Sequence, residues 1–256
     1  MIVYEFPLNE RVRTWLRLED LFDKARFFVE AADPRSHHAA LLALFELVEV
    51  MARPELKSEM IQELERQKAG LEGLRGNPAV DAQRLDDVLA RIAVSLAQLH
   101  AINGKPGQSL RENDWLASIR SRTSIPGGAC SFDLPGYHYW LNSPASQRAV
   151  DLVGWLRPLL PLQAAVDLIL KLLRESGVAN RHLACAGMFQ LMLGGRVAHL
   201  LRIGVADERP CAPEVSANKY AVNIRFTVVD KAQKPRTCEQ DVGFELELCS
   251  LSGCCQ

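Results

Sequence analysis

Apolar residues recur at three- and four-residue spacing along most of the first 177 residues, which is the pattern of amphipathic helices. The clearest case is the stretch 85–99, where Leu, Val and Ile repeat with a period near 3.6. Asp33 followed by Pro34 has the residue types of a helix N-cap and a first helical position. The Gly-Asn-Pro sequence at 76–78 is typical of a helix end. This part of the chain is predicted to be a bundle of helices.

After residue 177 the period of the pattern changes from 3.6 to 2, which favours half-buried β-strands. We predict that 187–193 and 200–205 form a hairpin around the Gly-Gly turn that separates them. Residues 220–228 and 242–248 alternate apolar with polar side chains. These two stretches are predicted to pair with each other as antiparallel strands.

The predicted architecture is of the α+β class. An N-terminal α-helical bundle domain covers residues 1–177, and a small antiparallel β-sheet domain covers residues 178–256. Residues 2–6, IVYEF, are β-prone and are predicted to pair as an additional edge strand. The sequence shows no internal repeat and no low-complexity tract.

Composition narrows the class of protein. At 256 residues, 48% of them apolar, the chain can bury a core without disulfides or metal ions. Its seven cysteines are interpreted as thiols of a cytosolic protein, since nothing indicates an oxidising compartment. A net charge of -1 argues against a general nucleic-acid binder, which needs a basic excess. A nucleic-acid-binding interaction module is kept as an alternative.

No membrane insertion and no secretion are expected. The N-terminus lacks a basic region followed by an apolar one. The apolar run 153–173 is interrupted by Arg157, Pro158, Pro161 and Asp167, so it is too broken to cross a bilayer.

The stretch 124–141, SIPGGACSFDLPGYHYWL, interrupts the helical pattern. Its Pro-Gly-Gly sequence ends the preceding helix, because proline lacks a backbone donor and glycine has few conformational limits. Three arginines precede the stretch, and His138 lies among aromatic residues within it. The arginines are Arg111, Arg120 and Arg122, and the aromatic neighbours are Tyr137, Tyr139 and Trp140. This mixture suits a peptide-binding surface better than a reaction centre.

A thiol-dependent enzyme using Cys130 and His138 is a second alternative, because a neighbouring imidazole can activate a thiolate. No recognisable sequence signature surrounds Cys130, and we interpret it as a small buried thiol. His37 and His38 are interpreted as solvated side chains.

No metal site, cofactor or enzymatic activity is expected. Cys249, Cys254 and Cys255 lack the paired spacing of a tetrahedral zinc site. The phosphate-loop, dinucleotide-binding and metalloprotease motifs are absent from the sequence.

Basic residues from both predicted domains form the candidate binding site. They are Arg17, Arg120, Arg122, His138, Lys219 and Arg225. If the β-domain docks beside the stretch 124–141, these side chains line one groove, where arginine is suited to pair with carboxylates and to stack on rings. Scattered surface cations are the alternative interpretation.

Four sequence blocks resemble the bacterial cell division protein ZapD family. They are FPLNERVRTWLRLE at 6–19, LREND at 110–114, RSRTSIPGGACSFDLPGYHYWL at 120–141 and FELEL at 244–248. The resemblance spans nearly the whole chain. It implies a cytoplasmic homodimer that acts at the mid-cell division site. It also implies binding to the C-terminal tail of FtsZ and bundling of FtsZ filaments at the Z ring during septation.

The resemblance also implies residues of the tail-binding surface. Arg17 lies in the TWLR block, His138 follows the SFDLP block, and Arg225 lies in the IRF strand. Arg53, Arg120, Arg122 and Lys219 stand at matching or adjacent basic positions. Asp114 and Ala221 depart from the pattern, since the family can carry arginine there.

Overall fold

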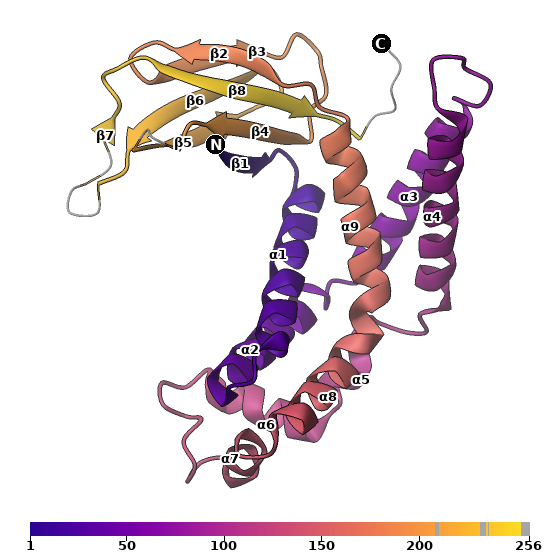
Figure 1. Cartoon of the computed structure of the whole chain (residues 1–256), viewed down its shortest axis with the longest axis vertical. Coiled ribbons are helices and arrows are strands. Elements are labelled where there is room, and N and C mark those ends of the chain that lie inside the picture. The colour runs from indigo at the N-terminus through magenta and orange to yellow at the C-terminus, as the bar shows by residue number, and fades with distance from the viewer. Residues whose placement is uncertain (208–209, 231–233, 235, 252–256) are drawn as a thin grey trace. The chain divides into compact units, whose positions relative to one another are not determined.

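A computed structural model describes residues 1–207, 210–230, 234 and 236–251. Contacts group the chain into two compact units. We call Thr14–Ile169 the helical unit, and Met1–Arg13 with Leu170–Gln256 the β unit. Helices occupy the N-terminal part and antiparallel strands the C-terminal part, so the predicted α+β class is confirmed (Figure 1).

The helices follow the apolar periodicity of the sequence. They are α1 (Glu10–Glu30), α2 (Pro34–Val50), α3 (Leu56–Glu72), α4 (Ala82–Ala101), α5 (Gln108–Arg111), α6 (Asp114–Thr123), α7 (Pro135–Leu141), α8 (Ala145–Leu156), the 3-10 turn η1 (Arg157–Leu159) and α9 (Leu160–Glu175). Helix α3 packs against α4, and α2 packs against α8. Side chains such as Trp15, Leu41 and Met60 are fully buried in the core of the helical unit.

Helix starts are fixed by side-chain caps. The Asp33 carboxylate accepts hydrogen bonds from the backbone N–H groups of Arg35 and Ser36, and Pro34 is the first helical residue, as predicted. Asn113 caps α6 by accepting from the N–H of Leu116 at 3.0 Å. These caps satisfy donors that have no partner inside the helix.

The described residues of the β unit form two antiparallel sheets. The strands are β1 (Ile2–Pro7), β2 (Asn180–Ala184), β3 (Met188–Met192), β4 (Leu200–Val205), β5 (Cys211–Ala217), β6 (Ala221–Val228), β7 (Arg236–Thr237) and β8 (Val242–Cys249). One sheet has the order β1-β4-β8-β2, and the other has the order β3-β6-β5 with β7 also paired to β6.

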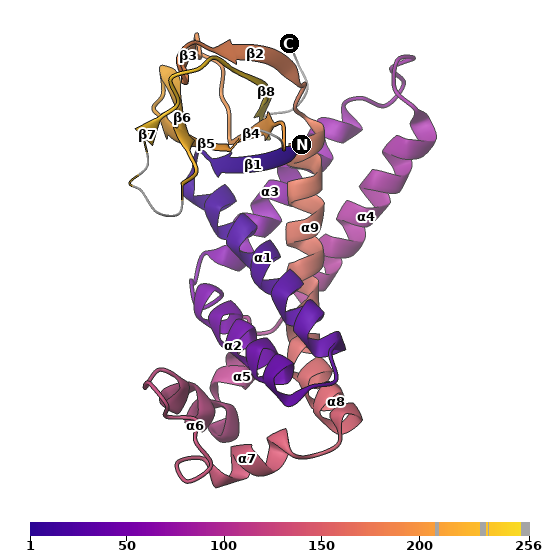
Figure 2. The same ribbon diagram turned by 60° about the vertical axis from the view of Figure 1, so that its left-hand side comes forward.

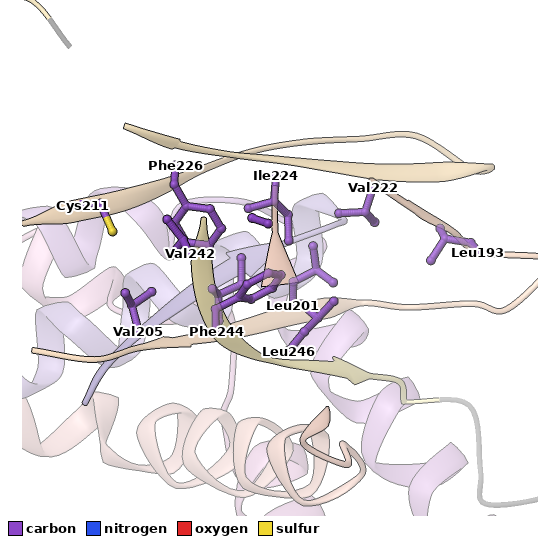
Figure 3. Packing of buried hydrophobic residues seen from close by; sticks show 12 residues of the cluster. Leu193, Leu201, Val205, Cys211, Val222, Ile224, Phe226, Val242, Phe244 and Leu246 are labelled. Atoms are coloured by element: carbon purple, nitrogen blue, oxygen red, sulfur yellow. The ribbon is translucent and has the colours of Figure 1, made fainter. Parts of the chain in front are cut away.

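An apolar cluster lies between the two sheets. Phe226, Ile224 and Val222 of β6 contribute one side of it, and Phe244 and Leu246 of β8 contribute the other (Figure 3). Because side chains alternate along a strand, the period of 2 in the sequence places these residues inward. The predicted strands therefore have the expected inner faces.

Two predicted strand pairings are wrong. Strand β3 pairs with β6, whereas β4 pairs with β1 and β8, so the predicted hairpin at the Gly-Gly turn is not formed. Strands β6 and β8 belong to different sheets rather than to one hairpin. The physical reason is that alternation identifies the buried face of a strand but not its neighbour. Strands β2, β5 and β7 were not predicted.

Strand β1 is an edge strand, which confirms the prediction for residues 2–6. It pairs antiparallel with β4, with Ile2 opposite Val205 at one end and Pro7 opposite Leu200 at the other. Contacts therefore place the first 13 residues with the β unit. The predicted domain ranges, 1–177 and 178–256, stay a prediction, since contacts do not test which stretch folds alone.

An ion-pair network ties the last turn of α9 to the first sheet within the β unit. The Glu5 carboxylate accepts from the Arg174 guanidinium at 2.7 and 2.8 Å and from Arg202 Nε at 3.0 Å. Arg202 Nη1 also donates to Glu247 Oε2 at 2.6 Å. Burial by itself raises the pKa of Glu5, but the hydrogen bonds and charges of the two arginines outweigh it, so that pKa lies below its ordinary value.

Candidate functional site

The loop between α6 and α7 is built from consecutive tight turns (Figure 2). Helix α6 ends at Thr123, so the predicted helix end at the Pro-Gly-Gly sequence is confirmed. Gly127 has a positive φ of 74°, which favours glycine. A Cβ on Gly128 would lie 2.3 Å from the carbonyl oxygen of Arg122, so only glycine fits there.

Helix α7 has one buried and one exposed face. Tyr137 and Trp140 are buried and stack with ring centroids 5.8 Å apart, and Trp115 packs edge-on against Trp140 at 5.7 Å. Trp140 Nε1 donates to Asp151 Oδ2 at 2.9 Å. His138 and Tyr139 lie on the exposed face of the helix. The aromatic residues of the stretch therefore divide into core and surface.

His38 joins α2 to the buried face of α7. Its Nδ1 lies 2.6 Å from the hydroxyl oxygen of Tyr137. Burial lowers the pKa of His38 and raises the pKa of Tyr137. Both groups are therefore held in their neutral forms near neutral pH.

Arg148 is buried and fixes the segment that follows α7. Its guanidinium donates to the carbonyl oxygens of Ala32, Leu141 and Ser143, and its Nε donates to His37 Nδ1 at 2.9 Å. His37 Nδ1 must therefore be an acceptor, which places the ring proton on Nε2, 3.3 Å from the oxygen of Val29. The prediction that His37 and His38 are solvated is wrong, because His37 is fully buried and His38 is half-buried against Tyr137.

Five of the predicted site residues lie in the helical unit. Arg17 is exposed on α1 and forms no hydrogen bond or ion pair with the described residues. Arg53 is exposed after α2, and its Nη1 donates to Thr14 Oγ1 at 2.8 Å, one turn before Arg17 on α1. This bond brings Arg53 beside the stretch of α1 that carries Arg17.

The other three residues of this set lie at α6 and α7. Arg120 is half-buried, and Arg122 is exposed with its Nη1 3.9 Å from Asp133 Oδ1. The exposed His138 ring lies 3.4 Å from the amide nitrogen of Asn142. Arg122 and His138 therefore flank the loop from its two ends.

Lys219 and Arg225 lie in the β unit and are exposed. Arg225 forms an ion pair with Glu214, its cross-strand partner on β5. Lys219 is in the turn between β5 and β6, where its Nζ lies 4.8 Å from the centre of the Tyr220 ring. A single groove drawing on both units stays a prediction.

A groove within the β unit carries cations that the sequence analysis did not select. It runs past residues 6–8, the Gly-Gly turn and the β5–β6 turn, and its lining includes Arg13, Arg196 and Lys219. No described residue of this lining is acidic. Arg13 Nε lies 3.3 Å from Glu10, and Arg196 Nε donates to the oxygen of Leu193.

Arg13 stands with Arg17, Asp20 and Lys24 at helical spacing, a pattern typical of a solvated helix face, and nothing in the sequence indicates that Arg13 lines a groove. For Arg196, the sequence indicates only that it directly follows the Gly-Gly turn, and this position alone does not predict a binding groove.

The structure does not support a thiol-dependent enzyme that uses Cys130 and His138. Cys130 is exposed, so the prediction of a buried thiol is wrong. The described contacts include no hydrogen bond between Cys130 and His138, whose ring lies beside Asn142 instead.

Within the described residues, no group of three or more His, Cys, Asp and Glu side chains is arranged to hold a metal ion. Cys254 and Cys255 lie outside the described residues. Burial raises the pKa of the Cys249 thiol to about 11, which disfavours its thiolate. No helix in the described part of the chain is long and apolar enough to cross a bilayer.

The fold and its surfaces define an α+β protein that presents exposed cations beside exposed aromatic side chains, as peptide-binding surfaces do. A family model described as "ZapD: Cell division protein" matches residues 16–225. The chain is also 50% identical over 251 residues to the cell division protein ZapD of Aromatoleum aromaticum, with 98% of each chain covered. The chain therefore belongs to the ZapD family of cell division proteins, which confirms the resemblance found in the sequence.

Proposed function

We propose that this protein binds the C-terminal tail of FtsZ and cross-links FtsZ filaments as a cytoplasmic homodimer at mid-cell. It promotes Z-ring assembly and performs no chemistry of its own. The observation that carries the proposal is the match to a cell division family along nearly the whole chain. The distribution of exposed cations supports it.

The proposed tail contacts are made by basic side chains of both units. They are Arg17, Arg53, Arg120, Arg122, His138, Lys219 and Arg225. All of them except Arg120 are exposed. The guanidinium groups of the five arginines can each form two parallel hydrogen bonds to a carboxylate, and Lys219 adds a positive charge, so this set suits an acidic peptide.

The groove of the β unit supports an acidic ligand independently. Arg13, Arg196 and Lys219 contribute three positive charges to a lining that also contains Phe6, Leu8 and other apolar residues. A peptide that carries both carboxylates and apolar side chains fits such a surface. Arg13 and Arg196 are therefore added to the proposed tail contacts.

Bundling follows from having two tail sites in one dimer. Once one site holds a tail, the second tail binds at a raised effective concentration, so weak single contacts give firm cross-links. A disordered tail loses conformational entropy when it binds, and charge pairing with a few apolar anchors offsets that loss. The output is lateral association of filaments.

Co-sedimentation with FtsZ tests the proposal. With intact FtsZ polymers, the protein should pellet and the polymers should appear as bundles by electron microscopy. With FtsZ that lacks its C-terminal tail, both effects should disappear while polymerisation continues. Equal pelleting with both forms of FtsZ would overturn the assignment of the tail as the binding partner.

A further inference from the structure

Phe132 is the most exposed of the large apolar side chains that the structure describes. It is 82% exposed, in the loop between α6 and α7. Two other apolar side chains of the same stretch are also exposed, Tyr139 at 78% and Ile125 at 49%. Aromatic side chains are enriched at protein interfaces, so three exposed large apolar side chains in one short stretch of chain make that stretch a candidate interaction surface.

The loop that carries Phe132 has a fixed backbone. The N–H groups of Gly128 and Cys130 donate to the carbonyl oxygens of Ile125 and Gly127, and those of Asp133 and Leu134 both donate to Cys130. The ion pair from Arg122 to Asp133 connects the end of α6 to the residue after Phe132. Because the loop is already ordered, binding through Phe132 requires little loss of backbone entropy.

The charged residues that neighbour Phe132 in the sequence are mostly basic, which favours an acidic partner. Between residues 115 and 142 the basic residues are Arg120, Arg122 and His138, and the one acidic residue is Asp133. Asp133 is paired with Arg122. Aromatic and arginine side chains are the types that most often dominate the binding energy of an interface, and this stretch exposes both.

We propose that Phe132 is the aromatic anchor of this surface and packs against an apolar side chain of the FtsZ tail, while Arg122 and His138 pair with tail carboxylates. Tyr139, one position beyond His138, adds a second ring to the contact. The inference rests on the proposed function and extends it, because the residues assigned to the tail so far supply charge but no apolar anchor at this loop.

The test compares Phe132→Ala with Phe27→Ala in the full-length protein. Phe27 is also exposed, at 69%, and lies on α1 of the same unit, so it controls for loss of a surface ring. Binding of a fluorescent FtsZ-tail peptide is measured by anisotropy. Phe132→Ala should weaken binding by about tenfold or more, whereas Phe27→Ala should change it by less than about twofold.

Phe132→Trp is the conservative variant. It should retain peptide affinity within about twofold of the starting protein, because indole offers a similar apolar face. Its added fluorescence should shift to shorter wavelength when peptide binds, which reports burial of the ring directly. Wild-type affinity in Phe132→Ala, or no spectral shift in Phe132→Trp, would overturn the proposal.

Two further outcomes identify which claim fails. If the unmodified protein does not bind the tail peptide at all, the proposed function fails and this inference fails with it. If Phe132→Ala binds peptide normally but sediments as a smaller species, the anchor contacts a second copy of the chain. That result overturns the tail assignment of Phe132 and leaves the proposed function standing.

Discussion

At the scale of single residues, Arg17 and His138 offer the most direct test of the proposed tail site. Both side chains are exposed, on α1 and α7, and neither is part of the buried core. The double variant Arg17→Ala with His138→Ala should weaken tail binding by about tenfold or more, because two groups that pair with carboxylates are lost. Its thermal melt by circular dichroism should be nearly unchanged, since exposed substitutions cost about 0.5 kcal/mol or less.

Helix α4 provides the matched control. Arg91 and His100 are exposed there, so Arg91→Ala with His100→Ala removes the same two residue types from another surface. Tail binding should survive in this control. If both double variants bind equally well, Arg17 and His138 do not belong to the site.

The partners of His37 and His38 could not be predicted from the sequence. His37 and His38 are adjacent, yet His37 is fully buried against Arg148 while His38 meets Tyr137. Tyr137 is 99 positions from His38 in the chain, and Arg148 is 111 positions from His37. No local pattern can report such distant contacts, so neither pairing could be predicted.

At the scale of elements, the loop after α6 depends on Gly128. Replacing it with alanine forces a Cβ against the carbonyl oxygen of Arg122, 2.3 Å away, and that atom belongs to the backbone and cannot turn aside. Gly128→Ala should lower the free energy of unfolding by about 1–3 kcal/mol, as overpacking does elsewhere. Chemical denaturation measures this loss.

Gly136 in α7 is the control for this substitution. A Cβ there meets no atom within 4 Å, and the residue lies in a helix. Gly136→Ala should therefore stabilise the protein by roughly 0.5–1 kcal/mol, because alanine has the higher helix propensity. Equal stability of the two alanine variants would show that the loop can relax around residue 128.

The Glu5 network gives the β unit a defined dependence on pH. The pKa of Glu5 is lower in the folded protein than in the unfolded chain, so the unfolded state binds more protons as the pH falls. Its contribution is complete above the ordinary value of 4.5 and is lost as the pH falls through the folded pKa.

Glu5→Gln should therefore lower the free energy of unfolding by about 2 kcal/mol at pH 7, since two arginines lose their shared carboxylate. The difference from the unmodified protein should shrink at a pH below the folded pKa of Glu5. Glu245→Gln removes an exposed pairing with Arg181 and should cost about 0.5 kcal/mol or less. Denaturant titrations at several pH values compare the two variants, and an equal loss in both would contradict the network's role.

Some features of the helices and strands can be predicted from neighbouring residues in the sequence, and others cannot. The helix start at Asp33 and the edge strand at residues 2–6 follow from neighbouring residues, and both predictions are confirmed. The strand pairings do not follow from neighbouring residues, because any strand with one apolar face can pack on the same core beside different neighbours. The exposed cations of the proposed site could be selected by residue type, whereas the groove that contains Arg13 and Arg196 required the fold.

At the scale of the whole molecule, the proposed function requires two tail sites in one particle. An excess of free tail peptide should therefore dissolve preformed bundles, because it occupies both sites without linking filaments. Light scattering follows this loss, and a scrambled peptide of the same composition is the control. Bundles that persist at saturating peptide would point to a contact with the filament other than its tail.

The pairing of β1 with β4 has a consequence for how the protein is made on the ribosome. Strand β1 ends at Pro7, and its partner strand begins only at Leu200. At roughly 5–20 residues per second, the nascent chain carries an unpaired strand for roughly 10–40 seconds before a neighbour emerges. Tyr4 and Phe6, which pack against the apolar core of the β unit in the folded protein, are open to chaperones throughout that interval.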